Sequence, residues 1–159
     1  SDNTRTKEQG LLDIDYSIRL YELHARFYRR VKFTIAFISL ISGTAVVATV
    51  LSKNQPLAIA FSALLALLPI IDVLLNPSAK TEFFDSYRKR FCELKARMVR
   101  ADCTISQIDQ ELAQLYAEPC DEIEPLRRIA LHNNMTTHGY PEIATPPLTR
   151  YERLWAILA

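Results

Sequence analysis

The sequence predicts an all-α membrane protein in which a two-helix transmembrane hairpin is carried by long amphipathic cytosolic helices, and in which the chains form oligomers. Two apolar runs, residues 33–51 and 57–75, follow each other across the short polar link 52–56. The flanking segments are rich in charge, and their apolar residues recur every three or four positions, which is typical of amphipathic helices. With 159 residues, a net charge of +1 and only 3 glycines, the chain fits a single unit.

Both apolar runs are long enough to cross a bilayer. At about 1.5 Å of rise per residue, each reaches about the 30 Å of a hydrocarbon core. The first run has no charged residue, and the second has one acid, Asp72, near its end. At the bilayer centre an acid would cost about 2.5 to 3.5 kcal/mol, and near an end it costs less. The alternative, two buried helices of a soluble all-α domain, is disfavoured because neither run has a polar face.

The segment before the first run predicts an amphipathic helix over residues 12–32 that continues into the membrane without a breaker. Residues 1–10 are polar and aperiodic, so we expect them to be disordered. From there one apolar stripe recurs at steps of four and three: Ile14, Ile18, Tyr21, Ala25 and Tyr28. Basic residues precede the first run and predict interfacial anchoring: Arg26, Arg29, Arg30 and Lys32.

The distribution of basic residues predicts the orientation of the hairpin. The link between the two runs has one basic residue, Lys53, whereas basic residues crowd both outer flanks. By the positive-inside rule both termini are expected on the cytoplasmic side. The first thirty residues contain no short apolar core with a cleavage site, so we expect no signal peptide and a permanent membrane segment.

Small and polar residues within the hairpin give it distinct faces. Small residues predict helix-packing positions: Gly43, Ala58, Ser62 and Ala66. Polar residues near one face are candidates for lining a pore: Lys32, Ser39, Ser42, Thr49 and Asp72. The alternative is that the hydroxyls bond to carbonyls of their own helix and that Asp72 pairs with a flanking base. The sequence leaves both readings open.

The segment after the hairpin predicts cytosolic helices over residues 80–118 and 121–131. Ten apolar residues form an a/d seam over more than four heptads: Phe84, Tyr87, Phe91, Leu94, Met98, Ala101, Ile105, Ile108, Leu112 and Leu115. The seam packs against the pre-membrane helix of the same chain, joins several chains, or does both, and its pattern does not rank the two readings. Thr104 and Gln107 form a capping box that permits a kink.

The remaining residues, 132–159, predict a loop and a short C-terminal helix. Residues 133–147 are rich in turn formers and have no periodicity. A second capping box, Thr149 with Glu152, precedes a short apolar segment. We expect this helix to dock within the fold through its apolar side, which contains Leu154, Trp155 and Leu158.

The sequence lacks the motifs of catalysis, and we expect no enzyme, no cofactor and no metal site. It has no glycine-rich phosphate loop, nucleophile elbow, HExxH or recognisable carboxylate pair. Three cysteines and three histidines match no zinc spacing, and the odd number of cysteines favours free thiols in a reducing compartment. The near-neutral net charge gives no reason to expect direct nucleic-acid binding.

Four segments together resemble a known family. They are a basic amphipathic helix ending in ELHARFYRRVKF, a tight two-span hairpin, an FFDSYRKRFCELKARM helix and a further helical C-terminal region. This architecture, which covers residues 11–131, is similar to that of the SLATT domains, two-transmembrane effectors associated with SMODS and SLOG proteins.

The resemblance implies a function that the residues alone do not specify. It implies an oligomeric effector of bacterial anti-phage defence in the inner membrane, which forms a pore or disrupts the membrane when a sensor partner is triggered, and so causes growth arrest or cell death. The expected partners are membrane lipids, further copies of the chain and a sensor, which is a nucleotidyltransferase, a SLOG protein or a reverse transcriptase. The alternative is a non-enzymatic membrane anchor or scaffold that recruits a cytosolic partner through its coiled helices.

Overall fold

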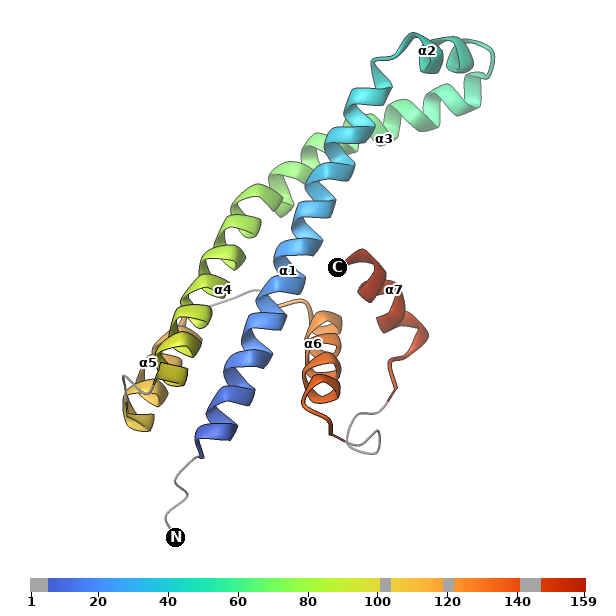
Figure 1. Cartoon of the computed structure of the whole chain (residues 1–159). Helices are drawn as coiled ribbons and strands as arrows, with labels where there is room; N and C mark the ends of the chain where they lie inside the picture. The colour runs from blue at the N-terminus through green and yellow to red at the C-terminus, as the bar shows by residue number, and fades with distance from the viewer. Residues whose placement is uncertain (1–5, 101–103, 119–121, 141–146) are drawn as a thin grey trace.

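The protein is all-helical in the part that the computed structural model describes, residues 6–100, 104–118, 122–140 and 147–159, which contain no strand. Within these described ranges seven helices follow one another (Figure 1): α1 Lys7–Ser42, α2 Ala45–Ser52, α3 Gln55–Leu75, α4 Pro77–Arg100, α5 Ile105–Ala117, α6 Glu124–Thr137 and α7 Arg150–Leu158. The fold class predicted from the sequence is confirmed at this level, as an all-α protein with one long apolar helix.

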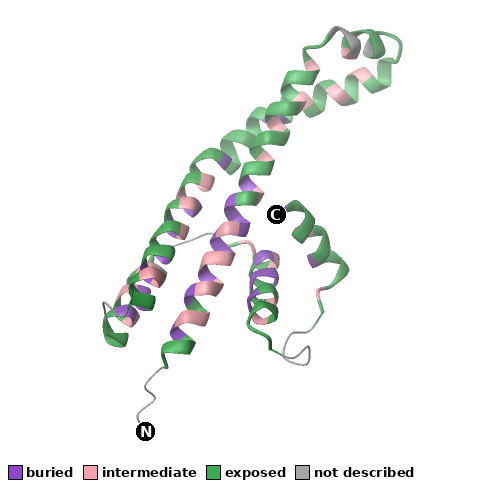
Figure 2. Cartoon of the chain, viewed as in Figure 1, coloured by how far each residue is buried: buried purple, intermediate pink, exposed green. Residues whose placement is uncertain are grey.

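The molecule consists of a body and an arm. The arm comprises residues 33–75, which are the C-terminal part of α1, then α2 and α3; the body comprises residues 7–32 of α1 together with α4, α5, α6 and α7. The buried residues gather in the body, whereas the arm is almost entirely exposed (Figure 2). The hydrophobic core therefore lies outside the apolar segment.

Helix α1 runs through both parts without interruption, as the sequence predicts. It begins earlier than expected because Thr6 and Gln9 form a reciprocal capping box, in which the Thr6 hydroxyl accepts from the Gln9 N–H and the Gln9 side chain accepts from the Thr6 N–H. No proline or glycine interrupts it between Gly10 and Ser42. Body and arm are consequently joined by one continuous helix of 36 residues.

The structure differs from the single helix expected over residues 33–51. Helix α1 ends at Ser42, and α2 starts at Ala45 after a turn at Gly43 and Thr44. The turn is closed by the Thr44 N–H, which donates to the carbonyl oxygen of Ile41 at 2.9 Å. Glycine is a weak helix former, and the hydroxyls beside it compete for backbone groups, so helix propagation is weakest at this point.

A single residue, Asn76, connects α3 with α4. Its φ of 40° lies in the left-handed region, which asparagine tolerates better than most residues. Its N–H donates to the carbonyl oxygen of Asp72 and closes the end of α3. Pro77, at the first position of α4, has no N–H to leave unpaired and begins the next helix at once.

The core of the body forms where α4 packs along α1. Tyr21 of α1 lies 5.3–5.9 Å from the rings of Phe84, Tyr87 and Phe91. Gly10 allows a close approach, because a Cβ there would lie 2.8 Å from the Met98 methyl carbon. Seven seam residues are buried: Phe84, Tyr87, Phe91, Leu94, Met98, Ile108 and Leu112. The seam thus packs within the chain, which is the first of the two readings left open by its sequence.

The other seam residues do not share this burial. Leu115 is half-buried and packs against the same cluster, whereas Ile105 is exposed, and Ala101 lies outside the described residues. The kink permitted by the sequence is present as an interruption between α4 and α5. The Thr104–Gln107 capping box begins α5.

Helix α6 covers a second face of α1. Its residues Leu126, Ile129 and Ala130 pack with Leu20 and Leu23, which the stripe predicted on α1 does not include. Helix α6 extends to Thr137, beyond the predicted end at residue 131, so the loop expected from residue 133 begins later. The predicted capping box of Thr149 and Glu152 starts α7.

Candidate functional site

The arm exposes an unusually large amount of apolar surface. Large apolar side chains are exposed along its whole length: Phe33, Phe37, Leu40, Ile41, Val50, Leu57, Ile59, Leu64, Leu67, Ile70, Ile71, Val73, Leu74 and Leu75. Patches of this kind on a folded protein mark contact with a membrane or with other proteins. The arm is therefore the candidate functional site.

One helix of the described residues is long and apolar enough to cross a membrane, and it begins at Gln55. Helix α3 has 21 residues, which at about 1.5 Å each correspond to about 30 Å. Its apolar stretch is almost wholly exposed, unlike the core helix of a soluble domain. Leu68 is the exception: it is buried at the base of the arm, and no sequence pattern singled it out.

The candidate pore-lining residues are spread along the arm, with Lys32 directly below its base. Lys32 and Ser39 are exposed on α1, and Asp72 is exposed on α3. The prediction that Ser42 and Thr49 share a face assumed one continuous helix, and the turn at Gly43 and Thr44 places Thr49 on α2 instead.

Two hydroxyls of the arm bond to backbone carbonyls in their own segment. The Ser42 hydroxyl donates to the Ser39 carbonyl oxygen at 2.6 Å, and the Ser52 hydroxyl donates to that of Thr49 at 2.8 Å. For Ser42 this is the alternative that the sequence left open beside pore lining. A hydroxyl bonded in this way can face lipid at little cost.

The predicted packing residues are not all buried within one chain. Ala58 is half-buried, whereas Ser62 and Ala66 are exposed. Among the described side chains and backbone, a Cβ at Gly43 would meet only the Leu40 carbonyl oxygen, at 3.7 Å, so none of the described neighbours approaches closely there. In a single chain Gly43 therefore marks a turn. Of the small residues on α3 that were predicted to pack, Ser62 and Ala66 face outward.

Charged residues surround the base of the arm. The Arg29 guanidinium contacts the Asp85 carboxylate at 2.8 Å, with Arg88 at 3.7 Å from the same group. A polar groove of ≈ 500 Å³ lies there between α1 and α4, and it is lined by Arg29, Lys32, Ser78, Thr81, Glu82, Asp85, Ser86 and Lys89. Such cationic side chains suit the headgroup level of a bilayer.

A buried histidine ties α1 to α6 below the arm. His24 is fully buried and stacks on Phe84, with ring centroids 4.7 Å apart. Its Nδ1 lies 2.8 Å from the Leu20 carbonyl oxygen, while its Nε2 accepts the Ile123 N–H at 2.8 Å. The ring is therefore neutral, with its proton on Nδ1. Burial lowers the pKa of His24, the bond to Leu20 opposes this, and the positive Lys80 lowers it further.

Two further polar links hold the body helices to one another. Asn134 of α6 donates to the Leu12 carbonyl oxygen of α1 at 3.1 Å. Glu152 of α7 is buried against Arg128 of α6, with 2.8 Å between the charged groups. Backbone hydrogen bonding at Thr149, above all, lowers the pKa of the Glu152 carboxyl. The Thr149 cap was predicted from the sequence, whereas no sequence pattern pointed to Arg128 of α6 as the partner of Glu152.

The described residues contain no cluster of histidine, cysteine or acidic side chains that could hold a metal ion. No family model, curated protein or solved structure matches the chain. Function is therefore inferred from the exposed arm and from how the body holds it.

Proposed function

We propose that the chain is an oligomeric membrane effector of a bacterial anti-phage defence system, which forms a pore or disrupts the inner membrane when a sensor partner triggers it. The observation that carries the proposal is the apolar arm, most of whose described large apolar side chains are exposed. Burying such side chains is worth about 25 cal/mol per Å², so the arm is stable only where lipid or other chains cover it.

The connection between body and arm supports a triggered effector. Helix α1 crosses from one to the other without a break, and α3 meets α4 at the single residue Asn76. A rigid-body movement of the soluble helices would thus be passed to the arm through two helical connections. Movement of packed helices as a unit is one way in which a local contact becomes a larger change.

The exposed small residues of α3 support assembly of several chains. Ser62 and Ala66 are exposed, so a second copy can approach the backbone of α3 closely there, as small residues permit between helices in lipid. The resemblance to SLATT domains supports a sensor partner, either a nucleotidyltransferase, a SLOG protein or a reverse transcriptase. It also supports a location in the inner membrane, and the basic residues that flank the two apolar runs support cytoplasmic termini.

Membrane potential and growth test the proposal. Cells expressing the chain together with its genetic neighbour should depolarise and stop growing when the system is triggered. The Ala66→Leu chain should assemble poorly and leave the membrane potential intact, because the larger side chain blocks the close approach of a second copy. Ala63→Leu is the matched control, because it adds the same bulk to another exposed alanine of α3. Unchanged potential and normal growth with the triggered, unsubstituted system would refute the proposal.

A second candidate function is a membrane anchor or scaffold that recruits a cytosolic partner through its helices. The hydrogen bond from Ser42 to its own helix favours it, because a hydroxyl satisfied in this way gives no polar path. Replacing the arm by an unrelated two-span anchor separates the two functions. A scaffold would keep its activity after the exchange, and a pore would lose it.

A further inference from the structure

We propose that the C-terminal helix α7 lies in the membrane interface and binds an anionic phospholipid surface beside the base of the arm. This inference rests on the proposed membrane location of the arm. It adds a second, in-plane attachment that holds the body against the bilayer.

The outward face of α7 is apolar. Tyr151, Leu154, Ile157 and Leu158 are 60%, 61%, 73% and 51% exposed. Their spacing of three, three and one residues places them on one side of the helix. The side away from this face carries the buried Glu152, and Trp155, at the edge of the apolar face beside Tyr151, is held to the body, since its ring lies 5.2 Å from that of Phe27.

The exposed charges of α7 are positive. Arg150 and Arg153 are both exposed. The single acid of the helix, Glu152, is buried and paired with Arg128 of α6. A helix with an apolar face and exposed arginines is the type that binds the headgroup region of anionic membranes.

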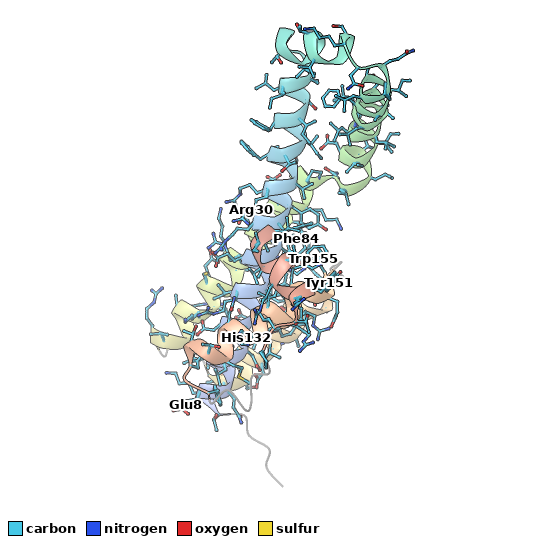
Figure 3. The ribbon with its side chains drawn as sticks, turned by 90° about the vertical axis from the view of Figure 1, so that its right-hand side faces the viewer. Glu8, Arg30, Phe84, His132, Tyr151 and Trp155 are labelled. Carbon is cyan, nitrogen blue, oxygen red and sulfur yellow. The ribbon has the colours of Figure 1, made fainter. Side chains whose placement is uncertain are left out.

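The position of α7 makes its apolar face continuous with that of the arm. An apolar groove of ≈ 480 Å³ lies between them, and it is lined by Phe27, Arg30, Val31, Phe33, Thr34, Ile35, Ile38, Leu68, Ile71, Ile157 and Leu158. The Arg30 guanidinium donates to the carbonyl oxygen of Ile157 and fixes the C-terminal end of α7. Arg30 lies nearest to the arm, with Trp155 and then Tyr151 farther from it (Figure 3).

These contacts favour lipid over a second copy of the chain. A symmetric dimer through the same faces would bring the exposed arginines of both copies, Arg150 and Arg153, into one interface, and like charges across an interface are unfavourable. A bilayer that covers Phe33 and Ile38 of the arm also reaches the adjoining end of α7. Anionic headgroups then complement the exposed arginines.

Trp155 is the only tryptophan of the chain, so its fluorescence reports on α7 without engineering. The full chain is reconstituted into vesicles of phosphatidylethanolamine and phosphatidylglycerol, with or without phospholipid brominated near the top of its acyl chains. Brominated lipid should quench Trp155, and iodide in the buffer should quench it little. Flotation of the vesicles shows independently whether the chain is inserted.

Leu154→Glu should abolish the quenching by brominated lipid while flotation is unchanged, because an acid on the apolar face opposes an anionic surface. Leu131→Glu is the matched control, as Leu131 is an exposed leucine on α6, and it should keep the quenching. Ile157→Glu provides a second variant should Leu154→Glu alter the circular dichroism of the chain.

Three results would overturn the inference. They are an inserted chain whose Trp155 is not quenched by lipid, quenching that survives both acidic substitutions on α7, and crosslinking of two copies through α7 with Trp155 shielded from lipid. In each of these the proposed effector function stands. A chain that does not float with the vesicles would instead refute both proposals.

Discussion

The buried His24 gives the sharpest prediction about the body. In His24→Phe the ring still stacks on Phe84, but the Ile123 N–H loses its acceptor. A partly buried donor left without a partner costs about 1 to 3 kcal/mol. The bond to Leu20 adds little, because that carbonyl oxygen already accepts within α1. We therefore expect His24→Phe to lower the free energy of unfolding by about 1 to 3 kcal/mol.

The same contact predicts a dependence on pH. The ordinary pKa of 6.5 is lowered in the folded chain, chiefly by burial, so below that pH the unfolded chain binds a proton that the folded chain does not. The contribution of neutral His24 to stability is then complete above about pH 6.5. It is lost as the pH falls towards the lowered pKa, by at most about 1.4 kcal/mol per pH unit. His24→Phe should remove this part of the slope.

Urea unfolding in detergent, followed by Trp155 fluorescence, measures the stability, and hydrogen exchange of the Ile123 amide measures the local contact. After correction for the intrinsic rate, the Ile123 amide should exchange faster in His24→Phe than in the unsubstituted chain. In the unsubstituted chain it should exchange faster at pH 5 than at pH 7.5. His132→Gln, on α6, controls for the loss of a histidine elsewhere. An Ile123 amide that exchanges equally in both chains would refute the assignment of His24 Nε2 as its acceptor.

Three further predictions concern local structure, and each is measured by urea unfolding in detergent. Asn76→Ala should lower the free energy of unfolding by about 1 to 2 kcal/mol and Asn76→Gly by much less, because the left-handed φ of 40° opposes a Cβ. Equal losses in the two variants would contradict this. Thr104→Ala removes the cap of α5 and should cost about 1 kcal/mol, whereas the exposed Ser106→Ala should be near neutral. Leu126→Ala, at a fully buried site, should cost about 2 to 5 kcal/mol, unlike Leu131→Ala at an exposed one.

The packing of α1 against α4 could be predicted because each helix carries its own stripe. Ile14, Tyr21 and Tyr28 recur at the same spacing as Phe84, Phe91 and Met98, and two such faces have to be buried. The pattern could not say whether the partner belongs to the same chain. Local geometry was predicted equally well where it depends on few residues, as at the capping boxes of α5 and α7.

The second face of α1 could not be predicted, because no pattern in it is visible along the chain. His24 and Ile123 are separated by 99 positions, and only the folded body brings them within 2.8 Å. Leu20 and Leu23 fall outside the regular stripe, so their burial depends on α6 being present. The turn at Gly43 was missed for another reason: hydropathy measures the length of an apolar run but not its continuity as a helix.

The contacts along α1 differ in how directly they bear on the arm. Helix α6 is bonded to α1 at His24, and α7 is bonded to it at Arg30, one helical turn before Phe33. No breaker lies between these contacts and the arm. Helix α4 packs along the same part of α1, with Asp85 paired to Arg29, and it also meets α3 at the left-handed joint of Asn76, where the direction can change. A partner that shifts α6 therefore acts on the arm through the unbroken α1, and the exposed surface of α6, which the proposed lipid contact of α7 leaves free, is where contacts of the proposed sensor should first be sought.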